Sequence, residues 1–207
     1  INDFFNSVSY FYSVSYIRVL IMEENLTQEE SLIKRIVICG PESTGKTTMI
    51  NNLSVYFQTN YVDEFARDFL QIKWDSKKEI CSKEDLIQIA KGQIKAENTK
   101  IKNSNKLIFC DTNILTTLAW SRTHFDEFCD PWLEKQSKLL TYDYYLILNT
   151  DIPWVKDDLR DRPKDRKKMF LAHKKELDNL NVDYDIINGS DFEKRFNKAL
   201  EYIKNKY

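Results

Sequence analysis

Cysteine, histidine, glycine and proline are all scarce in this sequence of 207 residues, which has four cysteines, two histidines, four glycines and four prolines. Collagen-like and low-complexity chains contain far more glycine and proline, so both classes are excluded. The cysteines form no CxxC pair and no zinc-type cluster with the histidines, so no zinc module is expected. Cys39 and Cys110 lie inside apolar runs, which is typical of buried, reduced thiols.

An excess of charge of one sign is also missing. The chain has 31 basic and 32 acidic residues, which gives a formal net charge of −1. Such a chain has no general field that attracts nucleic acid, so no nucleic-acid partner is expected and any phosphate ligand must be held by local charge. Hydrophobic residues make up 42% and charged residues 30%, a balance typical of a globular domain with its own core.

Long uninterrupted hydrophobic runs are lacking as well. Residues 1–21 are apolar and aromatic, but polar residues interrupt them, and no basic segment or cleavage site accompanies them. We therefore expect no signal peptide, no membrane partner and a cytoplasmic protein. Met22 opens a polar stretch, so we interpret 1–33 as an N-terminal extension of a domain spanning 34–207, with a functional start at Met22. A membrane-surface or partner-docking arm is the alternative for residues 1–21.

Short apolar runs rich in β-branched residues alternate with longer amphipathic stretches from residue 34 onward. The alternation predicts an α/β fold of three αβα layers, with a mainly parallel sheet of about five strands. Ser82 and Asp85 form a capping-box pattern, so we expect Ser82 to cap a helix over 82–102. The predicted strands are 35–39, 61–64, 106–111, 142–149 and 184–188; the predicted helices are 46–57, 65–70, 82–102, 112–120, part of 156–175 and a terminal helix capped by Asp191.

Residues 40–47, GPESTGKT, match the phosphate-binding pattern G-x-x-x-x-G-K-[ST] at every fixed position. Gly40 and Gly45 allow the backbone to turn its amides toward an anion, and the following helix directs its N-terminus to the same point. Lys46 adds charge for the β- and γ-phosphates, and the Thr47 hydroxyl is placed for Mg²⁺. The predicted ATP-binding residues are Gly40, Glu42, Ser43, Thr44, Gly45, Lys46, Thr47 and Thr48.

Asp111 ends the apolar run 107–110, as expected of a Walker-B acid. A carboxylate at the end of that strand can hold Mg²⁺ together with Thr47, so these two residues are the predicted metal ligands.

Carboxylate and guanidinium groups follow the second predicted strand, at the sheet edge where open α/β sheets bind ligands. Glu64 is predicted to face the γ-phosphate and to accept a proton or hydrogen bond from an acceptor hydroxyl. Arg67 lies one helical turn further on, where it would clamp phosphate or orient Glu64. A surface ion pair between the two is the alternative. Asn113 and Trp120 are further predicted substrate contacts.

The densest cationic segment contains Arg160, Arg162 and Arg166. Arginine suits multidentate phosphate contacts, so we predict a mobile arginine-rich lid that closes over ATP, with a solvated helix face as the alternative. Trp154 and Trp120 are the tryptophans nearest the predicted ligand edge; they would stack on a base or pack in the core.

The two histidines, His124 and His173, have no metal-like spacing, and ordinary surface roles are expected for them.

Together, the segments GPESTGKT, VDEFARDF, LIFCDTNILTTLAW, YDYYLILNTDIPWVKDDLRDRP and YDIING resemble the kinase domain of NadR-type ribosylnicotinamide kinases, in the AAA_28 group of P-loop proteins. The resemblance runs from about residue 34 to the end of the chain. It implies ATP-dependent phosphorylation of nicotinamide riboside to nicotinamide mononucleotide. By that likeness Lys46 and Thr47 serve ATP and Mg²⁺, Glu64, Arg67 and Asp111 surround the riboside and metal, and Arg160 and Arg162 belong to the lid.

The adenylyltransferase signature of bifunctional members, an HxGH-type motif, does not occur, so we expect a stand-alone kinase. The predicted catalytic residues are Lys46, Glu64, Asp111, Arg160 and Arg162, with either Glu64 or Asp111 as the base. A kinase for another nucleoside or nucleotide, and a nucleotide-binding regulatory module, are the alternatives. No NKxD motif follows the 142–149 strand, which disfavours GTP. A homo-oligomer is left open.

Overall fold

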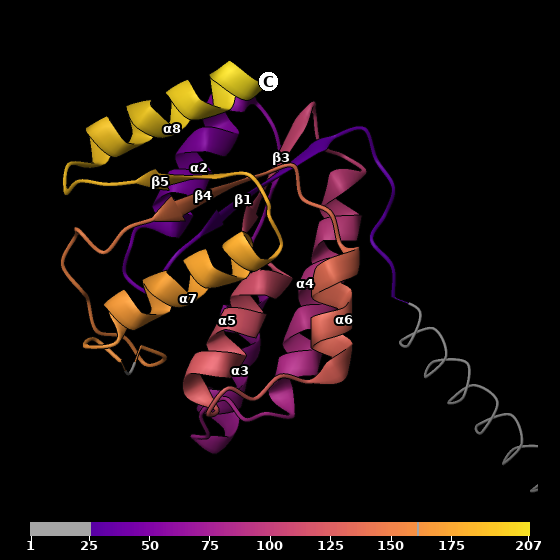
Figure 1. The fold of residues 1–207 in the computed structure, drawn as a ribbon, viewed down its shortest axis with the longest axis vertical. Helices are drawn as coiled ribbons and strands as arrows, with labels where there is room; N and C mark the ends of the chain where they lie inside the picture. Colours follow the sequence, from indigo (N-terminus) through magenta and orange to yellow (C-terminus); the bar gives the residue numbers. More distant parts are fainter. Residues whose placement is uncertain (1–25, 161) are drawn as a thin grey trace, which may run out of the picture.

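A parallel sheet lies at the centre of the computed structural model, which describes residues 26–160 and 162–207 (Figure 1). Its strands are β1 (Lys34–Cys39), β2 (Tyr61–Val62), β3 (Leu107–Asp111), β4 (Tyr144–Leu148) and β5 (Tyr184–Ile187). They are ordered β2-β3-β1-β4-β5, and each neighbouring pair runs parallel. The predicted five-stranded parallel sheet is confirmed.

Helices cover both faces of this sheet and so complete the three layers (Figure 1). They are α2 (Lys46–Phe57), α3 (Phe65–Lys77), α4 (Asp85–Ile101), α5 (Ile114–His124), α6 (Pro131–Leu139), α7 (Arg166–Asn179) and α8 (Phe192–Lys206). Alternate residues of β1 enter different cores: Ile36 and Ile38 pack with α2 and α8, whereas Val37 and Cys39 pack with α4, α5, α6 and α7. Strands buried on both faces explain why β1, β3 and β4 read as continuous apolar runs.

The order of the strands fixes the place of the ligand site. β1 lies between β3 and β4, so the chain first leaves β1 toward β2 and β3 on one side of the sheet and later crosses to β4 and β5 on the other. Open α/β sheets bind ligands at such a switch point, beyond the carboxyl ends of the strands. Residues 40–45 lie there, directly after β1.

The boundaries of several elements differ from the predictions. Strand β2 covers Tyr61 and Val62 only, and α3 continues to Lys77 instead of ending at residue 70. Helix α4 begins at Asp85, not Ser82, although the Asp85 carboxylate does accept a hydrogen bond from the Ser82 amide at 2.7 Å. That contact closes a turn ahead of the helix, because the Asp85 and Leu86 amides donate to carbonyls only three residues back.

Helix α6 was not predicted. It begins with an Asp130 cap, whose side chain accepts from the Trp132 amide at 2.8 Å, followed by Pro131 in the first turn. The residues it buries are Leu133, Gln136 and Ser137, so its inward face carries little of the apolar signal that identifies a helix in a sequence.

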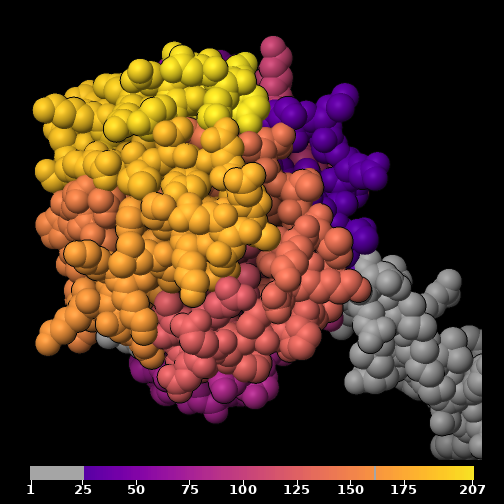
Figure 2. Space-filling view, in the orientation of Figure 1, coloured from indigo at the N-terminus to yellow at the C-terminus, as the bar shows by residue number. Residues whose placement is uncertain are grey.

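Residues 26–33, the described part of the predicted extension, lie against the flank of the domain, as the indigo atoms of Figure 2 show. The Gln28 side chain donates to the Thr141 carbonyl at 3.0 Å and accepts from the Thr141 amide at 2.9 Å. Asn98 of α4 forms a similar pair of hydrogen bonds with this segment. The interpretation of residues 1–21 concerns positions outside the described residues, and the boundary at 33/34 stays a prediction.

Over residues 26–160 and 162–207, none of the helices combines the length and the apolar content needed to cross a membrane. Within the same residues all the cysteines are free thiols, and Cys39 and Cys110 are buried, as predicted.

Candidate active site

The loop between β1 and α2 adopts the backbone conformation that its glycines predict. Gly40 has φ 134°, and a Cβ atom there would lie 2.5 Å from the Leu148 carbonyl oxygen of β4. Gly45, at the N-terminus of α2, has φ 82°, and Ser43 also has a positive φ of 54°. Alternation of this kind turns successive amides inward and forms an anion-binding nest at the helix N-terminus.

Thr47 and Asp111 meet at this nest. The Thr47 hydroxyl donates to Asp111 Oδ2 at 2.8 Å, which joins the first turn of α2 to the end of β3. Asp111 is 2% exposed, and its Oδ1 is buried without a hydrogen-bond partner among the described residues. Burial and the nearby Glu64 carboxylate raise the pKa of Asp111 above its ordinary range, although Lys46 and the Thr47 hydroxyl act against the rise.

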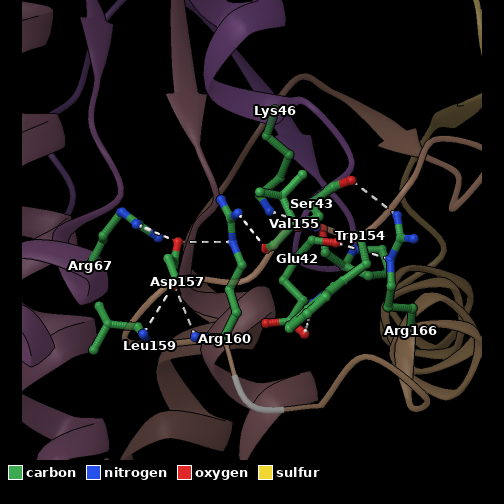
Figure 3. Close-up of polar contacts among 11 residues, drawn as sticks. Glu42, Ser43, Lys46, Arg67, Trp154, Val155, Asp157, Leu159, Arg160 and Arg166 are labelled. Atoms are coloured by element: carbon green, nitrogen blue, oxygen red, sulfur yellow. Dashed lines mark hydrogen bonds and ion pairs between the residues drawn. The ribbon is translucent and has the colours of Figure 1, made fainter.

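Lys46 extends from the start of α2 over the loop. Its Nζ donates to the Pro41 carbonyl at 3.2 Å, so the ammonium lies above the nest (Figure 3). His173 of α7 is close enough for this charge to act on it: burial first, and Lys46 second, lower the pKa of His173 to about 3. His173 is therefore a neutral imidazole at physiological pH.

A cavity of about 380 Å³ opens from the nest. All of the predicted site residues except Asp111 line it, so residues from α2, α3, α5 and the connection between β4 and α7 converge. These predicted lining residues are Gly40, Glu42, Ser43, Thr44, Gly45, Lys46, Thr47, Thr48, Glu64, Arg67, Asn113, Trp120, Arg160 and Arg162.

One wall of the cavity is formed by the start of α3 and by α4. Glu64 is the N-cap residue of α3, and its side chain makes no cap hydrogen bond. Instead, the Phe65 amide donates to Oε1 of Gln93 at 3.0 Å, so α4 supplies the partner for this helix end. Leu86 and Ile89 of α4 add apolar surface. The cavity thus has a polar end at the phosphate loop and a largely apolar wall beside α4.

Trp120 lies on the cavity wall with its ring stacked on His124, at a centroid distance of 3.9 Å and an interplanar angle of 12°. It is half-buried rather than part of the core. Asn113 also lines the cavity, but its side chain caps α5: it accepts from the Leu115 amide at 3.2 Å and donates to the Tyr145 hydroxyl at 3.0 Å. Both polar ends of Asn113 therefore have partners within the fold.

The connection between β4 and α7 packs directly on the phosphate loop (Figure 3). Ser43 Oγ donates to the Val155 carbonyl at 3.2 Å and accepts from the Val155 amide at 3.1 Å. The Trp154 indole donates to Glu42 Oε1 at 2.7 Å. Arg166 donates to the carbonyls of Glu42 and Ser43 at 3.2 and 3.0 Å. The predicted loop-to-helix run is confirmed, with α7 starting at Arg166; the predicted movement of this segment as a lid stays a prediction.

The structure corrects the expectation of a surface role for His173, which is 3% exposed and lines the cavity. His124 lines it too and is partly buried. A signal for His173 was present in the sequence: Met169, His173 and Leu177 recur every four residues, the spacing of one helix face, and all three are buried. Gln93 and Asp157 were also missed, because their partners, Phe65 and Arg67, lie far away in the chain.

Comparison with known protein families assigns the chain to one of them. The AAA_28 model, described as an AAA domain, matches residues 35–195. The chain belongs to this family. It is also similar to the trifunctional NAD biosynthesis/regulator protein NadR of Escherichia coli (strain K12), with 26% identity over 174 residues. That match covers 83% of this AAA_28 chain and 42% of NadR, so the chain spans less than half the length of this relative.

Two solved structures share the fold of this AAA_28 protein. A crystal structure of NadR in complex with NR has a TM-score of 0.71 and 18% identity, and covers 84% of this chain and 49% of that one. Thymidylate kinase from Ehrlichia chaffeensis has a TM-score of 0.60 and 11% identity, with 83% and 98% covered. The chain thus has the α/β P-loop kinase-like fold.

Proposed function

We propose that this protein transfers the γ-phosphoryl group of ATP to the 5′-hydroxyl of nicotinamide riboside, giving nicotinamide mononucleotide. The observation that carries the proposal is that one cavity contains both the phosphate nest and a second set of groups suited to a nucleoside. Glu64, Arg67 and Trp120 offer a carboxylate, a guanidinium and an aromatic face. A nucleotide-binding module without a small-molecule acceptor needs only the nest.

Different residues bind the phosphates and handle the hydroxyl proton during the transfer. The nest amides and Lys46 hold the β- and γ-phosphates, where fixed positive groups stabilise the charge that develops during an in-line displacement. Arg160 and Arg162 add cationic groups from the connection between β4 and α7. Glu64 or Asp111 accepts or orients the hydroxyl proton; both carboxylates lie at the carboxyl edge of the sheet, beside the nest.

Asp111 and Thr47 fit the Mg²⁺ ion that ATP-dependent transfer requires. Asp111 Oδ1 is a buried oxygen without a hydrogen-bond partner in the described residues, and an ion beside it would relieve the cost of that burial. The Thr47 hydroxyl lies 2.8 Å from the other oxygen. When bound, Mg²⁺ neutralises charge on the β- and γ-phosphate oxygens.

The choice of nicotinamide riboside is supported by the relatives. The NadR proteins are described as acting in NAD biosynthesis, and one NadR structure contains NR. The aromatic face of Trp120 on the cavity wall suits a heteroaromatic ring.

The test is a panel of acceptors scored by acceptor-dependent ADP release with Mg·ATP. The panel contains nicotinamide riboside, the common ribonucleosides and deoxyribonucleosides, and thymidine monophosphate. We expect the highest kcat/KM for nicotinamide riboside. Clear use of another acceptor with none of nicotinamide riboside would assign the protein to another nucleoside or nucleotide kinase class. Tight nucleotide binding without any acceptor-stimulated release would overturn the kinase assignment.

A further inference from the structure

A single carboxylate, Asp157, connects two arginines that line the cavity. It lies in the connection between β4 and α7, and its Oδ2 accepts a hydrogen bond from Arg67 NH2 at 2.6 Å and forms an ion pair with Arg160 Nε at 3.1 Å. Figure 3 shows the two guanidinium groups approaching Asp157 from opposite sides. Arg67 belongs to α3 and Arg160 to the connection itself. The contact therefore joins the cavity wall formed by the start of α3 and by α4, here named the acceptor wall, to the segment that covers the phosphate loop.

Asp157 is itself held in place by the backbone. Its Oδ1 accepts from the amides of Leu159 and Arg160, both at 3.0 Å, and these bonds form a tight turn around the carboxylate. Its side chain is 24% exposed. Hydrogen bonds from Arg67 and the Leu159 amide lower the pKa of Asp157 against the effect of burial, so the group is ionised at neutral pH.

The Asp157 carboxylate occupies only some of the N–H donors of each guanidinium group. Arg67 contributes NH2 to the ion pair, and Arg160 contributes Nε while its NH1 donates to the Val155 carbonyl at 2.9 Å. The guanidinium group has five N–H donors, so both arginines keep donors for a phosphate in the cavity. An arginine side chain loses rotamer entropy when it is ordered, and a contact that exists before the ligand arrives removes part of that cost from binding.

We propose that Asp157 is a positioning residue that aligns Arg67 and Arg160 for the phosphoryl group being transferred. This inference rests on the proposed function, since it assigns Arg160, and Arg67 from the wall that faces the nucleoside, to the phosphoryl group as it passes from ATP to the acceptor. Asp157 touches no substrate in this role; it acts through the two guanidinium groups. An ordinary surface ion pair, by contrast, contributes little to stability and nothing to the recognition of a phosphate.

The decisive variant is Asp157→Asn, with Asp158→Asn as its matched control. The asparagine keeps an oxygen that can accept from the two turn amides, but it turns an NH₂ group toward the arginines, so orientation is lost while the turn is retained. Asp158 is exposed and adjacent, and its replacement changes the net charge by the same amount.

Two readouts are measured for each variant. The first is the ratio of affinities for a non-hydrolysable ATP analogue and for ADP, by titration calorimetry. We expect Asp157→Asn to lower this ratio about 10-fold by weakening the analogue alone, and Asp158→Asn to leave it unchanged. The second is acceptor phosphorylation, in which kcat falls about 10-fold in Asp157→Asn whereas KM for ATP changes less.

Arg67→Gln and Arg160→Gln test the contact from its other side, so a poorly folded Asp157 variant does not leave the question open. Each should lower the affinity ratio, and Asp157→Asn combined with both should add little further loss, because the carboxylate acts only through these side chains. If the wild type discriminates the analogue from ADP and Asp157→Asn equals Asp158→Asn, the positioning role is wrong. If the affinity ratio falls as expected but no acceptor is phosphorylated by the wild type, the proposed kinase function fails while the positioning role stands.

Discussion

At the scale of single residues, Asp111 is a buried carboxylate whose hydrogen-bonding capacity is only partly met by the described residues. A carboxylate that is 2% exposed, with one oxygen bonded to Thr47 and the other without a partner in the described residues, destabilises the protein by itself. A buried oxygen without a hydrogen-bond partner is typical of a binding residue whose missing partner is supplied by the ligand. This burial supports the proposal that the end of β3 is a ligand site rather than a part of the core.

Lys46 is the cation of the nest, and Lys46→Ala should abolish phosphoryl transfer while the fold is retained. The ammonium donates to a carbonyl of its own loop, and Lys46 belongs to neither hydrophobic cluster of the described residues, so its removal leaves their packing intact. Loss of one group that stabilises the transition state costs roughly 100-fold or more in kcat. Steady-state ADP release measures the effect, and thermal unfolding checks the fold. Lys100→Ala, at an exposed position on α4, is the control. Unchanged turnover in Lys46→Ala would refute the assigned role.

Glu97 of α4 is a second buried carboxyl group, and it has no part in the proposed phosphoryl transfer. It is 1% exposed and accepts from the Tyr142 hydroxyl at 3.2 and 3.0 Å. Burial raises the pKa of Glu97 to about 7, although Tyr142 and Arg35 partly oppose the rise. Between about pH 4.5 and 7 the folded state therefore keeps a proton that the unfolded state has lost, so the free energy of unfolding decreases as pH rises through this window.

Glu97→Gln should remove this contribution. The difference in unfolding free energy, variant minus wild type, is expected to rise by up to about 3 kcal/mol between pH 4.5 and 7 and to level off above that. Urea unfolding at a series of pH values measures it. Glu201→Gln, at an exposed position on α8, should follow the wild type throughout. Parallel profiles of Glu97→Gln and wild type would contradict the assignment.

At the scale of elements, the docking of α3 on α4 sets the acceptor wall. A Cβ at Gly92 of α4 would lie 2.1 Å from Cε1 of Phe65, so the glycine provides the space in which the first residue of α3 packs. The neighbouring Gln93 accepts from the Phe65 amide at 3.0 Å. Ring and backbone of Phe65 are thus both fixed by α4, and with them the adjacent Glu64.

Gly92→Ala should destabilise the protein and impair transfer, against the usual trend. In a free helix this change stabilises by about 1 kcal/mol, but here the added methyl group displaces Phe65, and overpacking typically costs about 1–3 kcal/mol. Denaturant unfolding and kcat/KM for the acceptor are the measurements. In a Phe65→Ala background, where the ring is gone, Gly92→Ala is expected to be neutral or stabilising. A stabilising effect in the wild-type background would show that Phe65 does not need this space.

Elements whose pattern agrees with their packing were predictable from the sequence. The apolar runs of β1, β3 and β4, the helix over 46–57 and the Asp191 cap of α8, which accepts from the Lys194 amide at 2.8 Å, all appear as expected. Helix α6 was not predicted because it buries few apolar side chains. The start of α4 was predicted three residues too early because Asp85 closes a turn ahead of the helix.

At the scale of the whole molecule, the strand order brings together residues that are far apart in the sequence. Thr47 and Asp111 are 64 positions apart, and Arg67 and Asp157 are 90 apart. The first pair was predictable, since Asp111 ends β3 and Thr47 stands at the start of α2, both at the switch point of a parallel sheet. The second was not, because the path of the connection after β4 depends on tertiary contacts and has no periodic pattern.

Binding of Mg·ATP should stabilise the whole domain, and Thr47→Val should remove the part that depends on Mg²⁺. A ligand at 100 times its dissociation constant adds about 2.7 kcal/mol to the free energy of unfolding. For the wild type we expect a larger increase in melting temperature with the ATP analogue plus Mg²⁺ than with the analogue plus EDTA. Thr47→Val should show the same, smaller increase in both. Thr99→Val, at an exposed position on α4, serves as the control and should behave as the wild type. An equal loss with and without Mg²⁺ would contradict a metal role for Thr47.

The most direct measurement of the central claim is a crystal structure of the protein with Mg²⁺, a non-hydrolysable ATP analogue and nicotinamide riboside. The expected result has the β- and γ-phosphates within hydrogen-bond distance of the amides of 40–47, and the ribose 5′-hydroxyl directed at the γ-phosphate beside Glu64. A triphosphate outside the nest, or a nucleoside bound away from the wall formed by Glu64, Arg67 and Trp120, would contradict it.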